Sequence, residues 1–234
     1  TEIAKRMYRL LAPPPDSDDA MAGGRLHLVA ISEAQRAFCP DLNYAGTVYN
    51  GIDTNLYPFR KDKEDYLLFL GRVNKEKGPE IAIEVAARAG MKLKMAVKMS
   101  EQFEQEYWRE VVEPRLTGSE EILGEISVTE KAALLAGARA TLFPIQWPEP
   151  FGLVMTESMA CGTPVLAFPL GAAPEVILDG VTGFLPPDVD GMISAIGRLD
   201  QIDPTACRAH VESKFGADTM SAGYEQIFER ILSG

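Results

Sequence analysis

The feature that most constrains the fold is a regular alternation of short apolar runs and helix-prone segments, which begins at Tyr66. We expect strands at residues 67–70, 92–97, 121–123, 140–143, 165–168 and 184–185. Helices are expected between them, as at Gly78 and Pro79, where a proline takes the first helical position. Strands that alternate with helices form a parallel sheet with right-handed crossovers. The sequence therefore predicts an α/β fold with a doubly wound parallel sheet.

The segments outside this alternation are less regular. A helical pattern over residues 1–11 is followed by a proline-rich break at 13–19. Residues 26–31 and 47–49 are predicted as strands, and Ser32 is expected to cap a helix at 33–38. We expect a partial α/β unit at 1–50, the regular domain at 51–214 and a C-terminal helix at 215–234. Further helices are expected at 79–89, 101–115, 129–136, 153–161, 191–199, 204–214 and 217–232, and Thr129 is expected to cap the third of these.

Composition excludes several functional classes. The net charge of −11 argues against a nucleic-acid or anionic-membrane partner. Three distant cysteines, Cys39, Cys161 and Cys207, make a disulfide framework or zinc site improbable and favour a cytoplasmic location. No apolar run approaches the roughly 20 residues of a transmembrane helix, and no signal peptide is visible. The first residue is Thr1 rather than Met, which leads us to expect a missing N-terminal part.

The loop and helix start around Gly152 form the strongest candidate for a ligand site. Open α/β sheets bind ligands at the carboxyl ends of their strands, and a helix start offers unpaired N–H groups to an anion. Glu149 precedes the predicted helix and Glu157 lies about one turn inside it. The pattern predicts a phosphate on the amides and sugar hydroxyls on the carboxylates. The alternative for Glu157 is a carboxylate favoured by the helix dipole, and Trp147 is interpreted as a structural clamp.

Two cations follow the first strand of the regular domain. Arg72 and Lys77 would lie at the same edge as the helix start, where they would grip a diphosphate by charged hydrogen bonds. Lys98 ends the second strand and is a possible further phosphate contact. The alternative is a solvated basic loop between a strand and a helix.

These residues stand in a pattern that resembles a known family. Glu149, seven intervening residues, Glu157 and then the run 159–164 look like the signature of the group 1 (family 4) retaining glycosyltransferases, which have the GT-B architecture. The resemblance extends to residues 48–53, 69–73, 77–78, 123–125 and 174–176. It implies a Rossmann-like, nucleotide-sugar-binding C-terminal domain at 51–214. Residues 1–50 would be a truncated remnant of the acceptor-side N-terminal domain, and the C-terminal helix would pack back on it.

The resemblance also implies roles for individual residues. Arg72 and Lys77 would neutralise the donor diphosphate, and Glu149 would lie near the transferred sugar as a site residue rather than a nucleophile. Glu157 would bind the ribose, while Glu125 and Ile126 would hold the base through main-chain groups unless they form a plain turn. The implied donor-binding set is Gly71, Lys98, Glu125, Ile126, Phe151, Gly152, Leu153, Val154 and Glu157. No metal and no cofactor are expected, since Arg72, Lys77 and the helix dipole would stabilise the negative charge of the diphosphate in place of a metal ion.

Two departures from the family pattern are visible. Paired glycines often precede Pro-Glu in the family, whereas this chain has Ala172 and Ala173 there, whose methyl groups would narrow the donor pocket or have no effect. The glycine-rich loop and histidine of the acceptor half have no match in residues 1–49, and His27 is a poor candidate.

The sequence thus predicts a retaining, metal-independent glycosyltransferase that moves a sugar from a nucleoside diphosphate, with UDP favoured, to a hydroxyl acceptor. This chain would supply the donor-binding half, and an N-terminal half or second subunit would be its partner. The main alternative is a non-catalytic nucleotide-sugar-binding module or donor subunit. An epimerase or a phosphorylase is disfavoured, because the extra acidic, histidine or cofactor-lysine residues they need are not visible.

Overall fold

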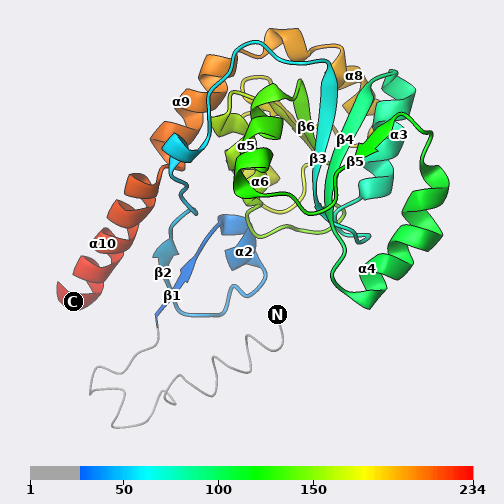
Figure 1. Cartoon of the computed structure of the whole chain (residues 1–234). Helices are drawn as coiled ribbons and strands as arrows, with labels where there is room; N and C mark the ends of the chain where they lie inside the picture. Colours follow the sequence, from blue (N-terminus) through cyan, green and yellow to red (C-terminus); the bar gives the residue numbers. More distant parts are fainter. Residues whose placement is uncertain (1–26, 234) are drawn as a thin grey trace.

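The computed structural model of the chain describes residues 27–233 (Figure 1). The helix predicted at 1–11 and the break at 13–19 lie outside the described residues. Two sheets are present in the described part, one of two strands and one of six, and both are parallel throughout. The α/β fold with a doubly wound parallel sheet is therefore confirmed.

The six-stranded sheet has the order β5-β4-β3-β6-β7-β8. Its strands are β3 (Tyr66–Arg72), β4 (Lys92–Lys98), β5 (Glu120–Ile122), β6 (Ala140–Phe143), β7 (Val165–Ala167) and β8 (Gly183–Phe184). The chain builds outward from β3 in one direction, then returns to β6 and builds outward in the other. The switch point between β3 and β6 opens a crevice at their carboxyl ends, where such sheets bind ligands.

Helices cover both faces of this sheet. The helices are α3 (Pro79–Ala89), α4 (Gln102–Tyr107), α5 (Val128–Gly137), α6 (Leu153–Ala160), α7 (Ala173–Val176), α8 (Val189–Ile196) and α9 (Pro204–Lys214). Contacts pair α3 with α8 in one layer and join α5, α6 and α9 in the other. The central strand β3 is buried from Tyr66 to Leu70, as expected for a parallel strand covered on both faces.

Local signals set most helix boundaries. Pro79 opens α3 and Gly90 ends it, as predicted. The predicted helix 101–115 is instead three consecutive helical pieces, with α4 followed by a π turn at Trp108–Val112 and a 3-10 turn at Glu113–Arg115. The prediction that Thr129 caps the next helix is wrong. Ser127 is the cap, because its hydroxyl accepts the Glu130 N–H while the Glu130 carboxylate accepts the Ser127 N–H.

The N-terminal part consists of β1 (Leu28–Ala30), α2 (Glu33–Ala37) and β2 (Tyr44–Thr47), with Ser32 capping α2 as predicted. The second strand was predicted at 47–49, but it ends at Thr47. Val48 and Tyr49 suggested a strand because their side chains are branched and aromatic. Instead, Val48 faces Gly223, and the Tyr49 hydroxyl bonds Glu175.

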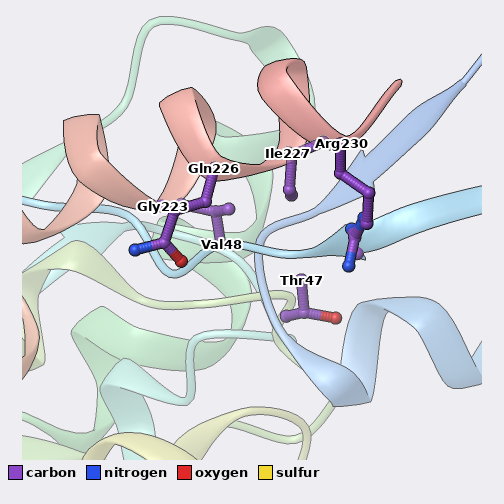
Figure 2. A pocket seen from close by; sticks show the side chains of 7 residues that line it. Thr47, Val48, Gly223, Gln226, Ile227 and Arg230 are labelled. Atoms are coloured by element: carbon purple, nitrogen blue, oxygen red, sulfur yellow. The ribbon is translucent and has the colours of Figure 1, made fainter. Parts of the chain in front are cut away.

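The C-terminal helix α10 (Ala217–Ser233) runs beside β2 rather than on the six-stranded sheet (Figure 1). Arg230 donates to the Ala45 carbonyl, and Ile227 packs over Gly46. Gln226 and Arg230 of α10 line a hollow of about 250 Å³ together with Thr47 and Val48. Figure 2 shows these side chains from close by.

Candidate functional site

A cleft of about 560 Å³ opens at the carboxyl ends of β3 and β6. Its walls come from the loops after these two strands, from the start of α6, and from the N-terminal part. The lining residues are Ile31, Gln35, Asn50, Leu70, Gly71, Arg72, Lys77, Phe143, Glu149, Pro150, Phe151, Gly152, Leu153 and Val154. The structure thus brings eight of the twelve predicted site residues to one cleft, namely Gly71, Arg72, Lys77, Glu149, Phe151, Gly152, Leu153 and Val154.

Lys77 and Glu149 form an ion pair inside the cleft. Lys77 Nζ donates to Glu149 Oε2, and the Trp147 indole N–H donates to the same oxygen at 2.9 Å. The Lys77 ammonium also lies 5.7 Å from the centre of the Trp147 ring, within cation–π range. The Lys77 and Glu149 side chains are only 22% and 13% exposed. Trp147 therefore holds the carboxylate beside the cation, which gives its predicted clamping position a specific partner.

Arg72 is paired with a carboxylate that does not line the cleft. Its Nε donates to Glu104 Oε1 at 2.5 Å, and Glu104 lies on α4, outside the cleft lining. The Arg72 side chain is 46% exposed, whereas Glu104 is fully buried. The hydrogen bond from Arg72 lowers the pKa of the Glu104 carboxyl. The carboxylate is therefore ionised at neutral pH.

The start of α6 supplies the polar backbone of the cleft. Gly152 precedes the helix with φ of +81°, and no side chain caps the helix start. A Cβ at this position would lie 2.8 Å from Met155 Cε and 2.9 Å from Phe143 Cζ, so a larger residue would be strained and crowded. Leu153 and Val154 of the first turn of α6 line the cleft, and the N–H groups of a first helical turn have no intrahelical acceptor.

The loop that carries Glu149 is fixed by a close backbone approach. Gly171, with φ of +58°, lies so near that an added Cβ would be 2.3 Å from the Glu149 nitrogen. The Ala172 N–H then donates to the Glu149 carbonyl at 2.9 Å. Ala172 and Ala173 are fully buried and do not line the cleft, so their methyl groups do not narrow it.

Glu157 lies outside the cleft lining. It is the fifth residue of α6 and only 6% exposed. Its Oε1 accepts hydrogen bonds from the Tyr57 hydroxyl at 2.8 Å and from Lys131 Nζ at 2.6 Å. Within residues 27–233, its Oε2 is buried without a hydrogen-bond partner. Burial, together with the bond to Glu157, raises the pKa of the Tyr57 hydroxyl, which stays protonated and can donate.

Lys98, Glu125 and Ile126 also lie outside the lining of the cleft. Lys98 ends β4, next to Arg72 on β3, and its Nζ bonds Glu125 at 3.2 Å. Both side chains are more than half exposed. They form an exposed ion pair at the end of β4 rather than a wall of the main cleft.

Some cleft residues were not predicted. Ile31, Gln35 and Asn50 come from the N-terminal part, and nothing in their local sequence distinguishes them from packing or turn residues. Glu104 likewise had no signal beyond its place in a polar helical segment. In the described part of the chain, no cluster of three or more His, Cys, Asp or Glu residues could hold a metal ion. The same residues contain no helix that is long and apolar enough to cross a membrane.

Comparisons with known proteins agree with this geometry. A glycogen synthase of Mycobacterium tuberculosis is 30% identical over 216 residues, covering 84% of this chain and 51% of the synthase. A glycosyltransferase involved in avilamycin A biosynthesis has a TM-score of 0.74 at 26% identity, covering 88% of this chain and 63% of its own. Anabaena HepE, solved with UDP and glucose, has a TM-score of 0.72 at 24% identity and covers the same shares.

The present chain spans about half the length of the synthase. Residues 57–200, which include β3 to β8 and most of the cleft, match the family described as glycosyl transferases group 1. Since this match extends over more than half of the chain, the protein belongs to the group 1 glycosyl transferases and has their GT-B type of fold.

Proposed function

We propose that this chain is the donor-binding half of a retaining glycosyltransferase, which transfers a sugar from UDP-sugar to a hydroxyl acceptor. The observation that carries the proposal is the convergence of Arg72, Lys77 and the start of α6 on one cleft. A diphosphate there would meet two cations and unpaired N–H groups, which stabilise the charge that develops on the leaving group. Glu149 would face the sugar, and the donor would be held in a reactive orientation.

The nucleoside end of the donor is assigned to the residues beyond the cleft. Glu157 would accept the ribose hydroxyls, since its Oε2 has no partner in the described part of the chain. Main-chain groups of Glu125 and Ile126 would hold the base, and Lys98 would add a phosphate contact. UDP is favoured as the nucleotide because the similar Anabaena protein was solved with UDP and glucose.

The acceptor side would come from residues 1–50 together with protein outside this chain. Support comes from the parallel pair β1–β2, since sheets of this kind are rarely so small, and from the chain's coverage of half of the synthase. The same observations favour a second candidate, a donor-binding module that binds the nucleotide sugar but does not catalyse its reaction by itself. Titration with UDP-, GDP- and ADP-sugars, together with a hydrolysis assay, separates the two: binding without turnover supports the module.

The diphosphate site is tested by removing its cations. Arg72→Ala and Lys77→Ala are each expected to weaken UDP binding by about 1.5–3 kcal/mol, the range for charged hydrogen bonds. Isothermal titration of the full 234-residue chain measures the effect. Lys75→Ala is the matched control, because it removes an exposed cation from the same loop outside the cleft. Unchanged affinity in the Arg72/Lys77 double variant would remove the diphosphate assignment.

A further inference from the structure

Glu104 is a fully buried carboxylate, and each of its two oxygens accepts a hydrogen bond. Its Oε1 accepts from Arg72 Nε at 2.5 Å, and its Oε2 accepts from the Glu101 N–H at 3.1 Å. The second bond belongs to the capping box that starts α4. Burying an ionised carboxylate is costly unless it is paired and hydrogen-bonded, so this position calls for more than a helix cap.

The bond from Arg72 uses the one guanidinium nitrogen that lies nearest the main chain. Fixing Nε restrains a long side chain that otherwise loses considerable rotamer entropy when it binds a ligand. It leaves the two terminal nitrogens, which form the fork that matches phosphate oxygens. In the described part of the chain, Glu104 is the only carboxylate in an ion pair with Arg72.

The two cations of the cleft are therefore held in opposite ways. Glu149, the partner of Lys77, lies inside the cleft, where it competes with an incoming anion. Glu104, the partner of Arg72, lies outside the lining and is bonded to Nε rather than to the two terminal nitrogens. A diphosphate can bind Arg72 without breaking the bond to Glu104, whereas it must displace or share Glu149 at Lys77.

We propose that Glu104 is a positioning residue for donor binding, which orients the guanidinium of Arg72 toward the diphosphate. The inference rests on the proposed function and adds to it a residue of α4 that does not line the cleft. The pair lies 32 positions apart in sequence and joins α4 to the end of β3, so the helix sets the geometry of the strand-end cation.

The test is Glu104→Gln, which keeps the shape of the side chain and removes its charge. It is expected to weaken UDP binding about tenfold, a typical loss for one charge-assisted hydrogen bond. Binding of uridine, followed by ligand-detected NMR, should change less than about twofold, because uridine carries no phosphate. In an Arg72→Ala background, Glu104→Gln should add no further loss for UDP, since its action passes through Arg72.

The matched control is Glu130→Gln. Glu130 has the same place in the capping box of α5 but contacts Ser127 rather than a cleft cation. The Glu130→Gln variant should leave the affinity for UDP unchanged. If Glu104→Gln does not fold, Arg72→Lys replaces it, because lysine keeps the charge but lacks Nε and the fork. That variant should lose most of what Arg72→Ala loses for UDP and leave uridine unaffected.

The outcomes separate this inference from the proposed function. Full UDP affinity in Glu104→Gln, in a protein where Arg72→Ala weakens UDP binding, overturns the positioning role alone. Equal losses for UDP and uridine, or a loss that persists without Arg72, also overturn it. No UDP binding by the wild-type chain would instead overturn the proposed function.

Discussion

At the scale of single residues, the main feature of the cleft is that Glu149 already occupies the cation Lys77. Glu149 Oε2 accepts from both Lys77 and Trp147, so the Lys77 ammonium is already paired with a carboxylate. Under the proposed function, an incoming diphosphate would have to share Lys77 with a carboxylate that also repels it. The ion pair would then lower the affinity for the anion while it holds both side chains in place.

Replacing Glu149 by Gln should strengthen the binding of UDP by about threefold to tenfold, because the amide neither competes for Lys77 nor repels phosphate. UDP without a sugar is used, so that lost contacts to the sugar do not enter. Isothermal titration measures the change, and Glu76→Gln, which removes an exposed carboxylate near Lys77, is the control. Unchanged or weaker UDP binding in Glu149→Gln would contradict the competition.

At the scale of elements, a carboxylate joins the N-terminal part to the six-stranded domain. Glu175 on α7 accepts the N–H groups of Glu33 and Ala34 at 2.8 and 2.7 Å, and the Tyr49 hydroxyl at 3.0 Å. It thus supplies the anion that favours the start of α2 from more than 140 residues away in sequence. Because α2 contributes Gln35 to the cleft, this contact also fixes one of its walls.

Glu175→Ala should lower the free energy of unfolding by about 2–3 kcal/mol, since it leaves two helix-start N–H groups and a hydroxyl without their charged acceptor. Urea unfolding measures the loss. Hydrogen exchange of the amides at residues 33–35 should accelerate in the same variant. The control is Glu175→Gln, which keeps one acceptor oxygen and should lose less. A change within about 0.5 kcal/mol, typical of a surface site, would refute the assigned role.

At the scale of the whole molecule, stability on the acid side depends on a histidine at the junction of its parts. His210 on α9 bonds the Val176 carbonyl at 3.0 Å and packs edge-on against Phe215 at 5.3 Å. Burial, assisted by the nearby Lys214 charge, lowers its pKa below the ordinary 6.5. The unfolded chain therefore takes up the proton first. The stabilising contribution is present above about pH 6.5 and is lost as the pH falls through the lowered value.

The loss should appear when unfolding by urea is compared at pH 7.5 and pH 5.5. The wild-type chain should lose more stability over this interval than His210→Gln, because glutamine does not titrate at position 210. The net charge of −11 falls in magnitude over the same interval, but that effect is common to both proteins and cancels in the comparison. Equal losses of unfolding free energy in the two proteins would show that His210 does not control the decrease in stability at acid pH.

Much of the fold was predictable because its signals are local. Pro79 and Gly90 mark the ends of α3, and the apolar run 140–143 is β6 without change. Predictions of element ends failed in two places. The predicted strand 47–49 was wrong because the Tyr49 side chain bonds a partner distant in sequence, and the cap of α5 was wrong because Ser127 and Thr129 are both capping residues and lie close together. The meeting of Arg72, Lys77 and Gly152 at one cleft was also predictable, since parallel strands end at the same edge.

The sequence by itself determined the succession of strands and helices along the chain, because periodicity and turn residues mark each element. It also determined the family, through a motif of fixed spacing, and the edge of the sheet where charged residues gather. Only the tertiary structure decided which carboxylate meets which cation. The Arg72–Glu104, Lys77–Glu149 and Lys131–Glu157 pairs span 32, 72 and 26 positions. No local pattern records such pairs, since charged side chains have no period that specifies a distant partner, and packing alone brings them within hydrogen-bond reach.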